Sequence, residues 1–186
     1  MTTPPARVLS VIVCGAGPAS EVRTLVKLAR ERAWTVQVIA TPAALDFIDA
    51  AALEAQTGSP VRSQYRKPGE PRSRSADAII VAPASYNTIN KWAQGISDTY
   101  ALGILAEATG LAVPIVVLPF INSALAARVL FRRSVEELRR EGIRILLGPS
   151  GVEPHQPHTG GNFIDSYPWH LALGEAERLT PATRTQ

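Results

Sequence analysis

Short apolar runs alternate with amphipathic stretches along most of the chain. The runs consist mainly of valine, isoleucine, leucine and alanine, which is typical of strands buried on both faces of a parallel sheet. Five runs have this character: residues 8–14, 36–40, 78–82, 114–118 and 143–147. Between them, apolar residues recur at helical spacing, as at Val22, Leu25, Val26 and Ala29. The pattern therefore predicts parallel strands joined by right-handed helical crossovers.

Several helix boundaries are also visible in the sequence. Ser20 is the expected N-cap of the first helix, and Thr41-Pro42 opens the second with proline in the first turn. Three further helical stretches are expected: one after the third strand as far as about Thr109, one over 123–141 before the cap residue Gly142, and one over 169–179.

This alternation predicts a single doubly wound α/β domain, Rossmann-like or flavodoxin-like, with a mainly parallel sheet of five or six strands. The 186 residues fit one domain over 1–186 and leave little room for a second. Residues 1–6 and 180–186 are expected to be flexible ends. The C-terminal segment 148–168, rich in glycine, proline and histidine, is expected to be irregular.

Composition excludes several classes of protein. The chain is 46% hydrophobic and 19% charged, as in ordinary soluble proteins. No apolar run approaches the roughly 18 residues of a membrane span, and no apolar signal-peptide core precedes the first strand. Cys14 is the only cysteine, so no internal disulfide is possible, and its place in the first strand suggests a small buried hydrophobe. We expect a cytoplasmic protein without a membrane partner.

Residues 57–75, here called the basic loop, interrupt the strand–helix rhythm with glycines and prolines. Within it, residues 62–74 carry five arginines and lysines against Glu70 alone. A solvated surface loop explains this charge, and a patch that attracts phosphate or an acidic substrate is the alternative. No aromatic stacking pattern accompanies the charge, so no nucleic-acid partner is expected.

Doubly wound sheets bind ligands at the carboxyl ends of their strands. After the first strand the chain reads Gly15-Ala-Gly17-Pro-Ala-Ser20, and such glycines let a phosphate approach backbone N–H groups at a helix start. The pattern is one residue short of the dinucleotide fingerprint, and Thr41 stands where that fingerprint needs an acid. A mononucleotide is therefore favoured over NAD(P), with a tight turn that binds nothing as the alternative.

The third strand is followed by four small polar residues: Ser85, Asn87, Thr88 and Asn90. Such side chains at a strand tip and in the first turn of a helix suit phosphate or amide recognition. Helix capping by Ser85 is the alternative, although it accounts for one of the four residues.

At this point the chain resembles a known family. Residues 83–88 read PASYNT, similar to the PASANT motif of the homo-oligomeric flavin-containing cysteine decarboxylases, with Tyr86 in place of alanine. That family includes phosphopantothenoylcysteine decarboxylases and lantibiotic peptidyl-cysteine decarboxylases. The Gly15 loop, the TPAALDF segment at 41–47 and Asp77 agree in order and spacing, so the resemblance covers about residues 7–148.

The resemblance implies FMN as cofactor, held between subunits of a homotrimer that can assemble further into a dodecamer. It places Gly15, Gly17, Ser20, Ser85 and Thr88 at the phosphate end, with Thr41 and Phe47 nearer the flavin. It also implies that Asn87 lies near the isoalloxazine or a small-molecule or peptide substrate. Asn122 would hold a substrate carboxylate or amide, with an ordinary helix N-cap as the alternative.

The chain differs from this family at residues on which the family's chemistry depends. A gap-free count places Gly69 where the family has its active-site histidine, and no histidine precedes Pro154. The family's "PxMNxxMW" motif keeps Asn122 but replaces its tryptophan with Ala126. The three histidines come late, at His155, His158 and His170. One of them can fold over the pocket if the segment 148–168 acts as a flap, as the resemblance allows. No metal site is expected.

Three functions therefore remain open. The first is a divergent flavoenzyme that uses flavin redox chemistry or decarboxylation, with Arg62, Arg66, Arg72 and Arg74 of the basic loop recognising the substrate. The second is a non-catalytic or regulatory flavin-binding subunit. The third is a true decarboxylase that uses one of the late histidines. Asn87 and Asn122 are the candidate catalytic residues under the first.

Overall fold

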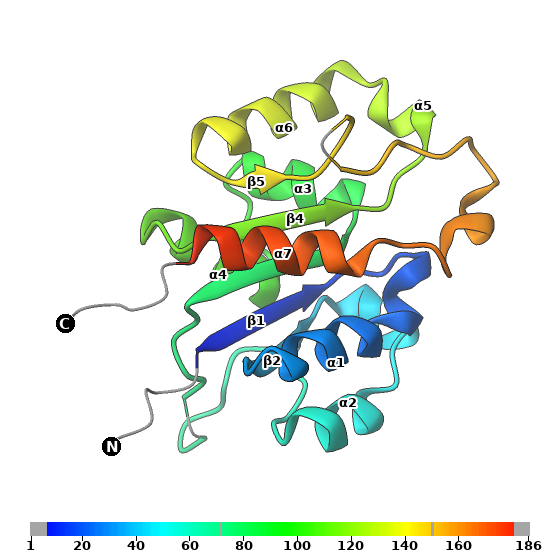
Figure 1. Cartoon of the computed structure of the whole chain (residues 1–186). Coiled ribbons are helices and arrows are strands. Elements are labelled where there is room, and N and C mark those ends of the chain that lie inside the picture. The colour runs from blue at the N-terminus through cyan, green and yellow to red at the C-terminus, as the bar shows by residue number, and fades with distance from the viewer. Residues whose placement is uncertain (1–6, 71, 150, 181–186) are drawn as a thin grey trace.

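The computed structural model describes residues 7–70, 72–149 and 151–180, which form one sheet with helices on both faces (Figure 1). The strands are β1 (Val8–Val13), β2 (Thr35–Ala40), β3 (Ala78–Ala84), β4 (Ile115–Pro119) and β5 (Arg144–Ile145). The α-helices are α1 (Arg23–Glu31), α2 (Ala50–Thr57), α3 (Tyr86–Ala93), α4 (Tyr100–Gly110), α5 (Ser123–Ala126), α6 (Val129–Arg140) and α7 (Trp169–Leu179). Three 3-10 helices are η1 (Gly17–Glu21), η2 (Pro42–Asp46) and η3 (Gly160–Phe163).

The strand order is β2-β1-β3-β4-β5, and every neighbouring pair is parallel. This confirms the predicted doubly wound α/β fold, with five strands. All residues of β1, β3 and β4 are buried, as their continuous apolar runs indicate. β5 is shorter than the predicted strand over 143–147 because, at this edge of the sheet, only Arg144 and Ile145 pair with β4.

Alternate side chains of each strand pack against different helices. Leu9, Val11 and Val13 of β1 share one core with apolar residues of α1 and α7. Ile12, on the opposite face, shares a second core with residues of α3, α4 and α6. In Figure 1, α1 and α7 lie in front of the sheet and α3 and α4 behind it. The chain thus crosses to opposite faces after β1 and after β3.

The start of the first helix differs from the prediction. Ser20 lies inside η1, and Val22 is the N-cap of α1, so the assignment of Ser20 as N-cap is wrong. Pro18 in the first turn of η1 starts a tighter helix before the α-helix begins. The Ser20 hydroxyl donates instead to the Gly17 carbonyl at 3.4 Å.

Two long helical stretches are each divided. The stretch to Thr109 consists of α3 and α4, separated at Gly95, whose φ of 72° lies in the left-handed region. The stretch 123–141 consists of α5 and α6, with Arg128 in an extended conformation as the N-cap of α6. Gly142, at φ 87°, follows the end of α6 as predicted, and α7 has the predicted bounds.

The expected flexible ends lie mostly outside the described residues. Thr180 is described, and its buried hydroxyl donates to the Ala176 carbonyl at 2.7 Å. Within the described ranges, none of the helices is both long and apolar enough to cross a membrane.

Candidate functional site

The carboxyl ends of β1 and β3 form the point where the chain divides between the two faces of the sheet. These neighbouring strands pair in parallel, and directly after the end of β1 the Cys14 N–H donates to the carbonyl of Pro83 in β3 at 3.1 Å. The loop after β1 leads to α1, whereas the segment after β3 leads to α3 on the other face. The Gly15 loop and the Ser85 segment therefore flank one crevice, at the position where doubly wound sheets bind ligands.

Glycine is required in the first of these loops by close packing. A Cβ atom at Gly15 would lie 2.8 Å from the carbonyl oxygen of Ala43 in η2. At Gly17 it would lie 3.2 Å from the Phe120 ring and 3.4 Å from Ile164. The Thr41 N–H donates to the Val13 carbonyl at 2.9 Å, so the segments after β1 and β2 are held together. Three predicted site residues, Gly15, Gly17 and Thr41, thus lie at one edge of the sheet.

Backbone N–H groups on both sides of the crevice are available to a ligand. In the described part of the chain, those of Gly15, Ala16 and Gly17 have no protein acceptor, and neither do those of Tyr86 and Asn87 in the first turn of α3. Adjacent free N–H groups in a turn, and the N-terminus of a helix, both favour an anion.

The Ser85 side chain caps α3 and takes part in a small buried network. Its hydroxyl oxygen accepts from the Thr88 N–H at 3.2 Å, and the hydroxyl donates to the Thr88 Oγ1 at 3.0 Å. The Cys14 thiol donates to the same Oγ1 at 3.3 Å. Burial raises the pKa of the Cys14 thiol, which keeps it neutral, and this confirms Cys14 as a small buried residue. The network fixes the end of β1 against the start of α3.

Other predicted site residues point to solvent. Asn87, in the first turn of α3, is exposed, and so is Ser20 in η1. Phe47, directly after η2, is 44% exposed, which is high for an aromatic side chain, and Leu45 beside it is 42% exposed.

Asn122 is the N-cap of α5, and its Oδ1 accepts from the Leu125 N–H at 3.0 Å. The capping interpretation of this residue is therefore confirmed for that oxygen. Its backbone forms a parallel bridge with His155, which attaches the C-terminal segment 148–168 to the carboxyl end of β4.

A pocket of about 260 Å³ lies between this segment and the end of β4. Its lining is mainly apolar and aromatic, and includes Phe120, Phe163, Tyr167, Pro154, Glu153 and His155. The other two late histidines, His158 and His170, are exposed. Phe120 was recognisable as a strand-tip position, but nothing in the local sequence marks Tyr167.

Tyr167 fixes the far end of the same segment. Its buried hydroxyl donates to the Leu118 carbonyl in β4 at 2.5 Å, and its ring packs edge-on against Trp169. Burial raises the pKa of Tyr167 well above its usual range, because the ionised form has no access to water. The segment is thus attached to β4 at both His155 and Tyr167.

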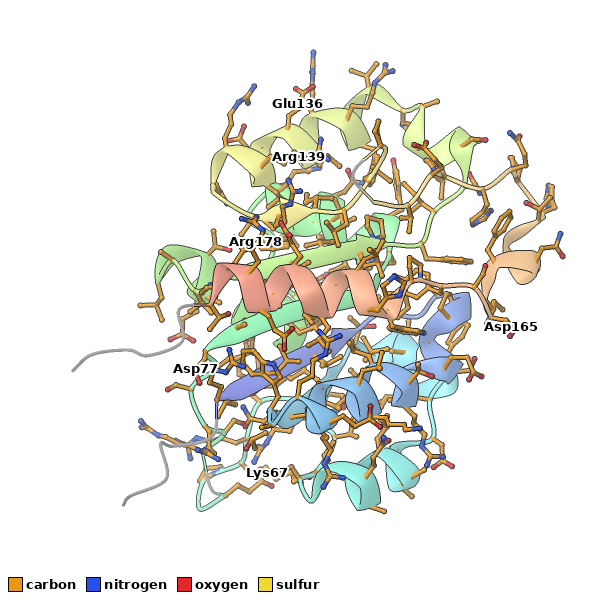
Figure 2. The ribbon with its side chains drawn as sticks, viewed as in Figure 1. Lys67, Asp77, Glu136, Arg139, Asp165 and Arg178 are labelled. Atoms are coloured by element: carbon orange, nitrogen blue, oxygen red, sulfur yellow. The ribbon has the colours of Figure 1, made fainter. Side chains whose placement is uncertain are left out.

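The basic loop is associated with a different region. Figure 2 shows Asp165 of the C-terminal segment at the carboxyl-end edge of the sheet, whereas Lys67 and Asp77 lie on the opposite side of the molecule. Arg62, Arg72 and Arg74 line a separate cavity of about 760 Å³, which the sheet face and α4 also line. Gly69 is exposed in the loop, with no atom within 4 Å of an added Cβ.

Across residues 7–70, 72–149 and 151–180, no cluster of three or more histidine, cysteine, aspartate or glutamate side chains could hold a metal ion.

The packing of Gly15 leads to a first prediction. Gly15→Ala should lower the free energy of unfolding by about 1–3 kcal/mol, because the new methyl group meets backbone atoms of Ala43 that cannot rotate away. Gly174→Ala is the control: its Cβ meets nothing within 4 Å inside α7, so it should stabilise by about 0.5–1 kcal/mol. Urea denaturation measures both, and a neutral Gly15→Ala would contradict the close approach.

A second prediction concerns Tyr167. Tyr167→Phe should lower the free energy of unfolding by about 1–3 kcal/mol, because the Leu118 carbonyl loses its buried donor. Tyr65→Phe, at a side chain that is 64% exposed, should change it by less than about 0.5 kcal/mol.

The same variant should alter the dependence of stability on pH. Above pH 10 the unfolded chain releases the tyrosine proton while the native state retains it, so wild-type stability falls as pH rises. The raised pKa of the Cys14 thiol likewise lowers the stability of the wild type as pH rises above about 9. Tyr167→Phe should therefore lose stability less steeply above pH 10 in urea titrations, and an unchanged slope would contradict the raised pKa.

Known proteins match both the sequence and the fold. The coenzyme A biosynthesis bifunctional protein CoaBC of Vibrio vulnificus is 30% identical over 148 residues, which cover 76% of this chain. The match covers 36% of that protein, so the chain spans about a third of its length. The cypemycin decarboxylase CypD superposes with a TM-score of 0.71 at 22% identity over 97% of both chains.

A further solved structure, the FMN binding protein AtHal3, gives a TM-score of 0.68 at 21% identity over 87% of this chain and 94% of its own. The family model described as Flavoprotein matches residues 3–161, which is most of the chain and includes the whole crevice. The resemblance seen in the sequence is confirmed: the chain belongs to the Flavoprotein family.

Proposed function

We propose that the chain binds FMN in the crevice between the carboxyl ends of β1 and β3. The observation that supports this is the pair of N–H clusters, at Gly15–Gly17 and at Tyr86–Asn87, on either side of one strand pair. A phosphate carries about two negative charges and several acceptor oxygens, which these groups and the N-terminus of α3 suit.

The composition of the crevice fits a mononucleotide. No acidic residue occurs in 15–20 or 85–90, so nothing in these segments repels a phosphate. Thr41 occupies the place where an acid would hold the ribose of a dinucleotide. Glycine at position 15 brings η2 close to the loop, and the exposed Phe47 that follows η2 is available to the ring system, whereas Thr41 is buried.

Each site residue then has a stated role. Gly15, Gly17 and Ser20 hold the phosphate end together with the Ser85–Thr88 turn, where Ser85 acts by positioning free N–H groups. Asn87, exposed in the same turn, meets the flavin ring or the substrate. Bound FMN would supply a two-electron acceptor for the substrate.

The reaction is proposed as flavin redox chemistry or decarboxylation on a small molecule or a peptide. Asn122 contributes through its amide nitrogen, since its oxygen caps α5. The exposed, side-chain-free Gly69 favours a second candidate, a non-catalytic flavin-binding subunit, because the counted position of the family's histidine offers no acid–base group.

We further propose that the protein is a cytoplasmic homo-oligomer, either a trimer or a dodecamer built from trimers. Leu45 and Phe47, each more than two-fifths exposed, follow Ala43, the residue that packs on the Gly15 loop, by two and four positions. A second subunit that covers these side chains would remove apolar surface from water and enclose the flavin.

The visible spectrum of the purified protein tests the proposal. A flavin absorption band, with FMN identified by mass in the released ligand, is expected. Protein that is colourless and takes up no added FMN would exclude every form of the proposal. Bleaching by cysteine-ended peptides or phosphopantothenoylcysteine supports the enzyme, whereas a stable spectrum together with binding to a histidine-containing homologue supports the subunit.

Asn87→Asp should weaken FMN binding about tenfold, because it places a negative charge beside the N–H groups that receive the phosphate. Gln94→Glu is the matched control, since it adds the same charge at the opposite end of α3. Titration of flavin fluorescence measures both affinities. Equal affinities for the two variants would place the phosphate elsewhere.

A further inference from the structure

The position of His155 is set by the backbone. Its N–H donates to the Ile121 carbonyl at 3.2 Å, and its own carbonyl accepts from the Ser123 N–H at 2.7 Å. These two bonds make a parallel bridge across Asn122, so that His155 continues the sheet beyond the end of β4. The imidazole is therefore carried by a residue whose backbone is hydrogen-bonded on both sides to the chain after β4.

Aromatic contacts fix the ring beside the crevice. Its centroid lies 4.8 Å from that of Phe120 and 6.1 Å from that of Phe163. The Phe120 ring also lies against Gly17, because a Cβ added at Gly17 would be 3.2 Å from it. A single side chain thus separates the imidazole from the glycine loop of the proposed FMN site.

The hydrogen bond at Nδ1 determines which nitrogen is free. Nδ1 lies 2.9 Å from the Gln156 carbonyl oxygen, and a carbonyl oxygen can only accept. Nδ1 therefore carries the proton of the neutral ring, and Nε2 carries the lone pair. Over the described ranges, no protein group bonds to Nε2.

Gly160 lies against this edge of the ring: a Cβ there would lie 3.0 Å from Cε1 and 3.2 Å from Nε2 of His155. Because glycine has no Cβ, no side chain at this position blocks Nε2, and His155 itself lines the 260 Å³ pocket.

The other side chains that line the pocket limit the kind of ligand group that can bind at Nε2. Its other titratable side chains are Glu153, which is exposed, and Tyr167, whose hydroxyl is already bonded to Leu118. Residues 119–121 and Gly17 contribute no charge. The Glu153 carboxylate disfavours an anion, so a neutral thiol or hydroxyl on an apolar stem suits the pocket best.

We propose that His155 Nε2 accepts a hydrogen bond, and then the proton, from the thiol or hydroxyl of a substrate in this pocket. The S–H or O–H bond breaks, its electron pair stays on sulfur or oxygen, and an Nε2–H bond forms. The resulting imidazolium keeps its Nδ1–H bond to the Gln156 carbonyl. This assigns His155 the acid–base role, and it rests on the proposed function only for the neighbouring flavin.

Three tripeptides, acetylated at the N-terminus and amidated at the C-terminus so that they carry no charge, test the donor requirement: Ala-Ala-Cys, Ala-Ala-Ser and Ala-Ala-Ala. In wild-type protein, the thiol peptide should shift the Nε2 resonance of His155 in nitrogen-15 NMR spectra, and it should bind roughly tenfold tighter than Ala-Ala-Ala. Equal binding of all three peptides, or an unmoved Nε2 resonance, would overturn the proposal.

Substitutions at His155 distinguish the contribution of Nε2 to peptide binding from that of the aromatic ring. His155→Phe keeps the aromatic contacts but should bind Ala-Ala-Cys roughly tenfold more weakly, at unchanged circular dichroism. His155→Gln removes both the ring and the Nε2 acceptor and should also bind Ala-Ala-Cys more weakly than wild type. His158→Asn, which tolerates the positive φ of 68°, and His170→Gln are the controls and should behave as wild type.

The two proposals can fail separately. NMR binding by His155 in protein that takes up no FMN would refute the flavin proposal and retain this one. Conversely, the wild-type protein could show a flavin spectrum while the His155→Phe variant binds Ala-Ala-Cys as tightly as wild type. That result would retain the flavin proposal and refute the role of His155.

Discussion

The parallel hydrogen bonding between β1 and β3 is the constraint on which the site depends. These strands are central and buried, and their hydrogen bonding continues past the end of β1 through the bond from Cys14 to Pro83 of β3. Because the following segments leave toward opposite faces, the first N–H groups of each segment find no carbonyl acceptor in the other. The fold therefore produces a pair of unpaired N–H clusters at this edge, and the buried Cys14–Thr88–Ser85 network holds them in place.

Most of the fold could be predicted because burial acts on long stretches of sequence. A strand buried on both faces must be apolar throughout, which made β1, β3 and β4 recognisable. The short elements could not be predicted in the same way. The division at Gly95, the early η1 turn and the short β5 each depend on a single residue or on the edge of the sheet, where periodicity carries little information.

The site shows the same division. The glycine loop and Ser85 were predictable, because a strand tip followed by glycine or a capping residue has a local signature. The pairing of Phe120 with His155 joins residues 35 positions apart, and Tyr167 meets Leu118 across 49 positions. Such contacts follow from the path of the C-terminal segment, which no local pattern in that segment specifies. His155 was therefore only one of three equivalent histidines in the sequence.

The way this segment is attached bears on how a ligand reaches the pocket. Backbone bonds hold it at His155, and the Tyr167 hydroxyl holds it to Leu118, so both attachments are to β4 or its immediate continuation. Opening the segment as a whole would break buried hydrogen bonds at both ends, at about 1 kcal/mol or more for each. The stretch between them contains Gly160 and Gly161 and is mostly exposed. Movement of that stretch alone leaves both attachments intact, so His155 keeps its position relative to the glycine loop while the pocket opens.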